Sequence, residues 1–202
     1  MAEERYNKLF RVTNDNQIQI TKPMVLLDTV WDDLRVPMQN TKINPTKSEP
    51  AFESFIGGTF TYAFAADNAD DESLLFAAQL PHSYKIGTNL RPHIHWSPST
   101  TNTGNAVFEL EYTSASIGGT LGATTSITAT DAADGTAFKH QLIGFDEIDG
   151  SNLGLSSMII CRLTRLGTDS ADTFTGKAFV LEFDFHFEID TPGGSYDEYS
   201  KA

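Results

Sequence analysis

Apolar and polar residues alternate with a period of two along most of this chain, which is typical of β-strands. Turn-forming residues separate the alternating runs, and no segment of about 12 residues has helical periodicity. Eight strands at this spacing predict an all-β fold, an antiparallel β-sandwich of jelly-roll type. The predicted strands are Gly58–Phe64, Ser73–Leu80, Pro92–Ser97, Ala106–Ser114, Thr124–Thr130, Phe138–Phe145, Ser156–Leu166 and Lys177–Asp190.

The last predicted strand has the most regular alternation. One face carries Phe179, Leu181, Phe183, Phe185, Phe187 and Ile189, and the other carries Glu182, Asp184, His186, Glu188 and Asp190. We expect the apolar face to lie across the core and the charged face to meet water or cations, because unpaired buried charges are costly. Arg162 and Arg165 of the preceding strand are the expected cationic partners, although only one of them can share that face.

The first 50 residues have a different pattern from the body, which we place at residues 51–202. Two short β-like pieces are followed by a segment containing Pro37, Pro45 and Pro50. This region forms either added strands of the body or an extended N-terminal arm that orders on another subunit. An arm of this kind could add a strand to a partner through backbone hydrogen bonds. Its apolar anchors would be Leu9, Phe10, Val12, Ile18 and Ile20.

Charge restricts the partners. The chain has 202 residues with 14 Lys and Arg against 27 Asp and Glu, a net charge of −13. Residues 1–50 carry seven basic and seven acidic residues, so the whole imbalance lies in the body. Nucleic acid is therefore not an expected partner, because phosphate binding needs a dense cationic face. No apolar run approaches a membrane span and the start lacks a signal-peptide pattern, so we expect a soluble protein made in the cytosol.

Two histidines carry the most suggestive chemistry. In a strand, His93 and His95 project to one face, and this spacing resembles the start of the cupin metal motif. No Glu follows within five residues. Completing such a site would need residues from later strands, the candidates being Glu109, Glu111, His140 and His186. We therefore favour hydrogen-bonded structural histidines and expect neither metal nor other cofactor. A cupin-like metalloenzyme using His93, His95 and His186 stays an alternative.

No catalytic constellation is recognisable elsewhere, so the protein is not expected to be an enzyme. The single cysteine, Cys161, lies in an apolar run and is interpreted as a buried core residue. The chain has no complete phosphate-binding loop and no G-x-S-x-G motif.

Several colinear segments between about residue 30 and residue 191 resemble a family of proteins encoded among the structural genes of tailed bacteriophages. They are Val30-Trp-Asp-Asp-Leu-Arg-Val-Pro, Leu80-Pro-His-Ser-Tyr-Lys with Gly87, Arg91-Pro-His-Ile-His-Trp-Ser-Pro, Leu110-Glu-Tyr, Ser157-Met-Ile-Ile-Cys-Arg and Phe183-Asp-Phe-His-Phe-Glu-Ile-Asp-Thr. The resemblance implies a virion component. Our hypothesis is a capsid cement (decoration) protein on the phage head, with the major capsid protein and further copies of itself, as a homotrimer, for partners. A tail, baseplate or head-fibre component that contacts host glycans is the alternative within the virion.

Overall fold

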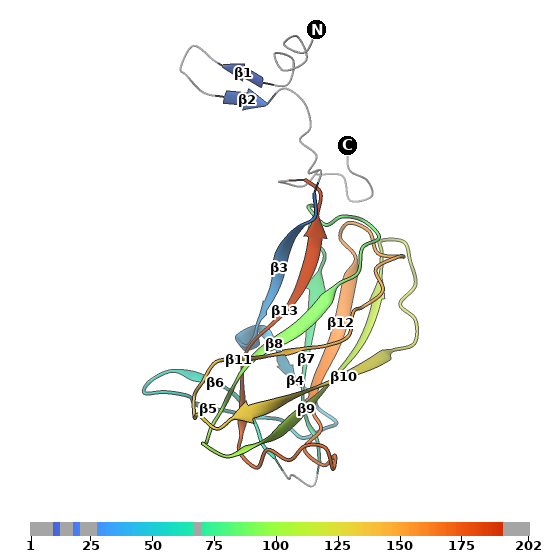
Figure 1. The fold of residues 1–202 in the computed structure, drawn as a ribbon. Coiled ribbons are helices and arrows are strands. Elements are labelled where there is room, and N and C mark those ends of the chain that lie inside the picture. Colours follow the sequence, from blue (N-terminus) through green and yellow to red (C-terminus); the bar gives the residue numbers. More distant parts are fainter. Residues whose placement is uncertain (1–9, 13–17, 21–27, 67–69, 192–202) are drawn as a thin grey trace.

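The computed structural model describes residues 10–12, 18–20, 28–66 and 70–191. Their fold is a sandwich of two antiparallel sheets, as the sequence predicts (Figure 1). The first sheet has the order β10-β9-β12-β7-β4, with β4 at Lys42–Ile43, β7 at Glu72–Gln79, β9 at Thr103–Ala115, β10 at Thr125–Asp134 and β12 at Met158–Arg165. The second has the order β11-β8-β13-β6-β5, with β5 at Ala51–Ser54, β6 at Phe60–Phe64, β8 at Arg91–Pro98, β11 at Gln141–Gly144 and β13 at Ala178–Ile189.

The pairing order is that of a jelly roll. The eight strands from β6 to β13 pair in nested fashion: β9 with β10, β8 with β11, β7 with β12 and β6 with β13. This is a long hairpin rolled over on itself. The pairs β9–β12 and β8–β13 then join these eight strands into two groups of four, β10-β9-β12-β7 and β11-β8-β13-β6, one in each sheet. All eight are the strands expected from the alternation, although β11 is shorter than predicted and leaves Phe138 in a turn with φ of 60°.

Residues 28–54 add strands to this body. Strand β3, Val30–Pro37, pairs with β13, and a short 3-10 helix at Met38–Asn40 leads into β4, which pairs with β7. β3 lies at a sheet edge and is largely exposed. Its charged residues and Pro37 disfavour pairing of this edge with a strand from another molecule. β1, Phe10–Val12, and β2, Ile18–Ile20, form a two-stranded sheet of their own.

A bulge in β13 corrects one sequence prediction. The register against β8 shifts between Val180 and Glu182, so Leu181 is an extra residue and the alternation changes face there. Val180 therefore joins the core together with Phe183, Phe185 and Phe187, whereas Phe179 does not. The prediction that Phe179 and Leu181 share the core face was wrong. The ring of Phe179 instead lies 5.0 Å from the ring of Phe55.

The expected pairing of β13 with Arg162 and Arg165 was also wrong, because β12 belongs to the opposite sheet. Arg162 forms ion pairs with Glu109 and Glu111 on β9. Arg165 is fully buried against Asp172. The carboxylates of β13 are paired from elsewhere, Glu182 by Arg35 on β3 and Glu188 by Lys85. Among the described residues, no helix is both long and apolar enough to cross a membrane.

Candidate functional site

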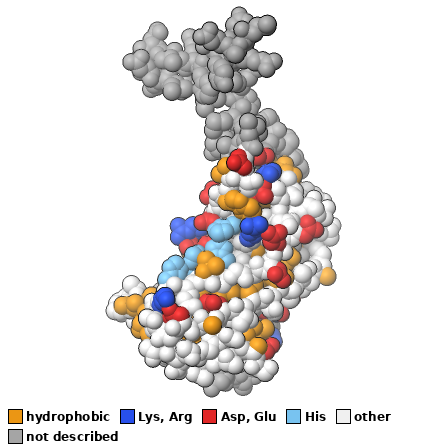
Figure 2. Space-filling view, viewed as in Figure 1, with side chains coloured by type: hydrophobic (Ala, Val, Ile, Leu, Met, Phe, Trp, Pro, Cys, Tyr) orange, Lys and Arg blue, Asp and Glu red, His pale blue; other side chains and the backbone are white. Residues whose placement is uncertain are grey.

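Four of the five histidines gather on the outer face of the six-stranded sheet. His93 and His95 come from β8, His186 from β13, and His140 directly precedes β11. Figure 2 shows the histidine side chains as a pale-blue band bordered by acidic and basic groups. We call these four residues the histidine cluster.

Strand pairing explains why the cluster forms. On β8, Ile94 and Trp96 are fully buried in the core, so the histidines between and before them point outward. The β8–β13 register sets Asp184 opposite His93 and Glu182 opposite His95. The outward face of β8 is thus brought against the charged face of β13.

Asp184 is the centre of the contacts. Its side chain is 3% exposed, and one carboxylate oxygen contacts Nε2 of His93. The other oxygen lies 3.3 Å from Nε2 of His95. His95 continues the chain of contacts, since its Nδ1 is 2.6 Å from Nε2 of His140. His186 has a carboxylate partner of its own, with Nε2 2.8 Å from Oδ1 of Asp33 on β3.

The buried carboxylate changes the acid–base behaviour of His93. Burial disfavours the imidazolium and lowers the pKa of His93, but the close contact and negative charge of Asp184 outweigh it. The net result is a raised pKa. The neighbouring carboxylate therefore makes His93 easier to protonate than an ordinary histidine.

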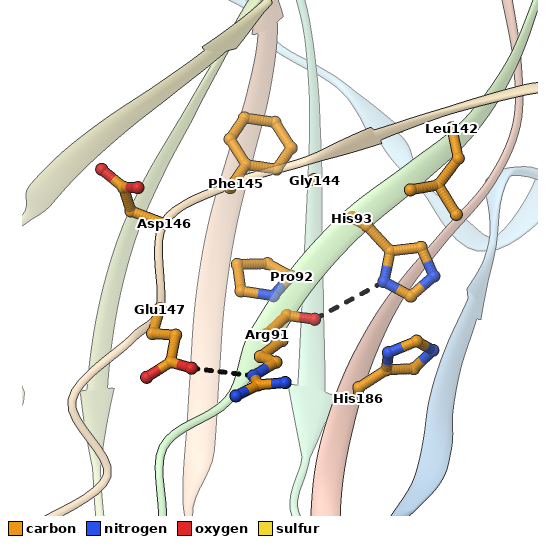
Figure 3. Close-up of a pocket in the computed structure, with 9 residues that line it drawn as sticks. All are labelled: Arg91, Pro92, His93, Leu142, Gly144, Phe145, Asp146, Glu147 and His186. Atoms are coloured by element: carbon orange, nitrogen blue, oxygen red, sulfur yellow. Dashed lines mark hydrogen bonds and ion pairs between the residues drawn. The ribbon is translucent and has the colours of Figure 1, made fainter.

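A surface hollow of about 350 Å³ opens beside the cluster. Figure 3 shows His93 and His186 next to each other on one side of it, with Arg91 and Glu147 on the side of the loop after β11. Arg91 donates to Glu147 over 2.7 Å, and Asn89 donates to the other oxygen of Glu147 over 2.8 Å. Both hydrogen bonds lower the pKa of Glu147, and the one from Asn89 has the larger effect. The hollow has a mixed lining, with charged side chains beside Pro92, Leu142 and Phe145.

The structure brings together some of the predicted candidates and separates others. One potential ligand atom each of His93, Asp184 and His186 lies within 4.8 Å of the others. Glu109 and Glu111 lie on β9 in the opposite sheet and pair with Arg162. Asp184 was missed as a candidate ligand, although its place two residues before His186 on one strand face was readable.

The remaining candidates have simple outcomes. Cys161 is buried as predicted, and burial raises the pKa of its thiol. Of the proposed arm anchors, Leu9 lies outside the described residues. The backbone register pairs Phe10 with Ile20 and Val12 with Ile18.

A second surface is apolar. The hairpin of β5 and β6 extends from the body (Figure 1), and orange side chains gather over it in Figure 2. Phe52, Ile56 and Phe60 are each more than half exposed, and the rings of Phe52 and Phe60 lie 5.9 Å apart. We call these three residues the hairpin patch. β5 is the last strand of its sheet, so one of its backbone edges is unpaired within the described chain.

Comparisons with known proteins give little beyond this. No protein-family model matches the chain, and no curated protein matches it. Among solved structures, the CBM22-1–GH10 modules of the Clostridium thermocellum endo-1,4-β-D-xylanase 10B complexed with xylohexaose share 12% identity, with a TM-score of 0.41. TmCBM61 in complex with β-1,4-galactotriose shares 13% identity, with a TM-score of 0.34. Isomalto-dextranase of Arthrobacter globiformis T6 complexed with panose also shares 13%, with a TM-score of 0.38.

These likenesses cover 79%, 78% and 83% of the present chain respectively. The chain spans only 28% of the xylanase structure and 24% of the isomalto-dextranase, but 88% of TmCBM61. At such identities and TM-scores, they assign no ligand or activity to this chain.

Proposed function

We propose that the chain is a non-enzymatic structural protein of a tailed-bacteriophage virion, a capsid cement protein that assembles as a homotrimer and bridges capsomers on the outside of the head. The observation that carries the proposal is the hairpin patch. Three large apolar side chains are exposed together beside a strand edge that no described residue pairs with, which is typical of a surface that another protein covers.

The charge distribution supports a second copy of this chain as the occupant of the patch. The body carries the whole net charge of −13, so two bodies repel each other wherever their charged surfaces meet. A contact between copies is most favourable where neither side presents carboxylates. On the hairpin, Glu53 is already paired with Lys177, which leaves the apolar side chains to make the contact.

The N-terminal segment supports a contact with the capsid. β1 and β2 pair only with each other within the described chain. A single two-stranded hairpin is marginally stable in water and gains stability by packing on another surface. The charge of residues 1–50 is balanced, so this segment can approach an acidic or a basic neighbour without strong repulsion.

The first test is the assembly state of the purified chain by native mass spectrometry. A trimer is expected for the unmodified protein, and Phe52→Ser with Phe60→Ser should shift it to a monomer. Ile117→Ser removes a comparably exposed apolar side chain from a loop outside the hairpin and serves as the matched control. A monomeric unmodified protein, or a trimer that survives the double substitution, would refute the role of the patch.

The second test is cosedimentation with phage heads assembled without this protein. Unmodified protein should sediment with the heads, and a chain lacking residues 1–22 should stay in the supernatant while keeping the circular dichroism of the folded sandwich. Retained sedimentation would refute the role of the arm. Absence of binding by the unmodified protein would refute the cement function itself.

A further inference from the structure

The histidine cluster has the donor set of a metal site. We infer that His93, Asp184 and His186 bind one divalent transition-metal ion, with Zn²⁺ as the representative species, on the outer face of the six-stranded sheet. Their potential ligand atoms lie within 4.8 Å of one another, and the imidazole rings of His93 and His186 are 4.3 Å apart at their centroids. Two imidazoles and a carboxylate suit zinc, iron, nickel or copper rather than calcium or magnesium.

The arrangement of protons supports a cation at this position. Nδ1 of His93 lies 3.5 Å from the carbonyl oxygen of Arg91, so the proton on this nitrogen has an acceptor. Nε2 of His93 faces the buried oxygen of Asp184. A buried ring nitrogen and a buried carboxylate oxygen this close need a cation between them, which is either a proton on Nε2 or a bound metal ion.

Both histidines also have the outer partners that metal-bound histidines use. A ligating histidine donates its second ring N–H to a carbonyl or carboxylate, which fixes the tautomer and the ring orientation. His93 has the carbonyl of Arg91 for this purpose. His186 has Asp33, with Nε2 2.8 Å from the carboxylate, which leaves Nδ1 of His186 for the metal.

The surroundings define the kind of site. The three ligands come from two paired strands, so the sheet holds them rigidly in place. His93 and His186 border the hollow of about 350 Å³, and a fourth coordination position would open into it. Arg91 lies on the same rim, where its charge is paired with that of Glu147. His95 lies two residues after His93 on the same face of β8 and contacts the second oxygen of Asp184, where it holds the carboxylate in place.

The test uses the full chain without a histidine tag, stripped with a chelator and titrated with ZnCl₂. Native mass spectrometry should show one Zn²⁺ per chain, and calorimetry should give the affinity. Asp33→Asn removes the outer partner of His186 and should weaken the affinity for Zn²⁺ by roughly 10–100-fold. His186→Gln removes a ligand and should weaken this affinity by more than that. Both side chains are nearly half exposed, so neither substitution should unfold the metal-free protein.

His82→Gln is the matched control, because it removes the one histidine outside the cluster. Its affinity for Zn²⁺ should equal that of the unmodified chain. Replacing Zn²⁺ by Co²⁺ should add visible absorption that His186→Gln abolishes. Absence of stoichiometric Zn²⁺, or an unchanged affinity in His186→Gln, would overturn the inference and leave a shared proton as the cation between His93 and Asp184. The readout uses the purified chain, so it does not depend on whether the chain binds phage heads.

Discussion

The ion pair between Arg165 and Asp172 is expected to be the most sensitive single interaction of the fold. Both side chains are fully buried. All five N–H groups of the guanidinium have acceptors: the two oxygens of Asp172 and the carbonyls of Phe64, Phe174 and Gly176, at 2.6 to 3.0 Å. Asp172 also accepts the backbone N–H of Val107. The pair thereby ties β12 to the end of β6, to β9 and to the loop before β13.

Asp172→Ala removes the counter-charge and leaves the guanidinium buried. The expected loss is about 3–5 kcal/mol of unfolding free energy, the cost of orphaning one member of a buried ion pair. At about 2–4 °C per kcal/mol for a domain of this size, the melting temperature should fall by roughly 6–20 °C. Arg165→Lys keeps the charge but has at most three donors for five acceptor positions, so it should also destabilise the protein.

Urea unfolding monitored by tryptophan fluorescence measures the effect, because Trp96 is fully buried and will report loss of the core. Glu53→Gln is the control, since it breaks the exposed pair with Lys177 and should cost about 0–1 kcal/mol. The double variant Arg165→Met with Asp172→Ala should cost clearly less than the sum of the single changes, because no buried charge remains. A loss below about 1 kcal/mol in Asp172→Ala would refute the reasoning.

Three further outcomes follow from single positions. The thiol of Cys161 should not react with a water-soluble disulfide reagent in the native protein and should react fully in urea, because burial raises its pKa. Gly104→Ala should cost about 1–3 kcal/mol, since φ is +134° and a Cβ would meet the carbonyl oxygen of Thr173 at 2.5 Å; Gly58→Ala, in open space, should be neutral. Trp96→Phe should cost about 0.5–1.5 kcal/mol in urea unfolding through loss of the 2.9 Å indole hydrogen bond to Asp131, which keeps Gln141 as a second donor.

The central strands were predictable because each buries one face. Their alternation between core and solvent appears directly in the sequence, and eight such runs indicated the jelly roll. β3 has a different pattern because it is an edge strand. Asp32 and Asp33 are both exposed there, so apolar and polar residues do not alternate along it.

The bulge in β13 could not be predicted for the opposite reason. Residues 178–181 are all apolar, so the sequence does not mark the position at which the backbone changes face. Only the register against β8 reveals that Phe179 leaves the core. Similarly, the partner of Arg165 lies in the loop between β12 and β13, and the path of that loop follows no periodic pattern.

The histidine cluster could be predicted from the sequence in part. That His93 shares a face with His95, and Asp184 with His186, follows from period-two geometry alone. A jelly-roll order also makes the two strands neighbours. The sequence does not show the register between β8 and β13, whose paired residues are about 90 positions apart. A slip of one residue would turn every side chain of one strand to the other face. The phenylalanines of β13 exclude a slip of one residue, because Phe183, Phe185 and Phe187 must point inward. The apolar packing of the sandwich therefore determines that the charged side chains of β13 and the imidazoles of β8 share the outer face, and the register then sets Asp184 opposite His93.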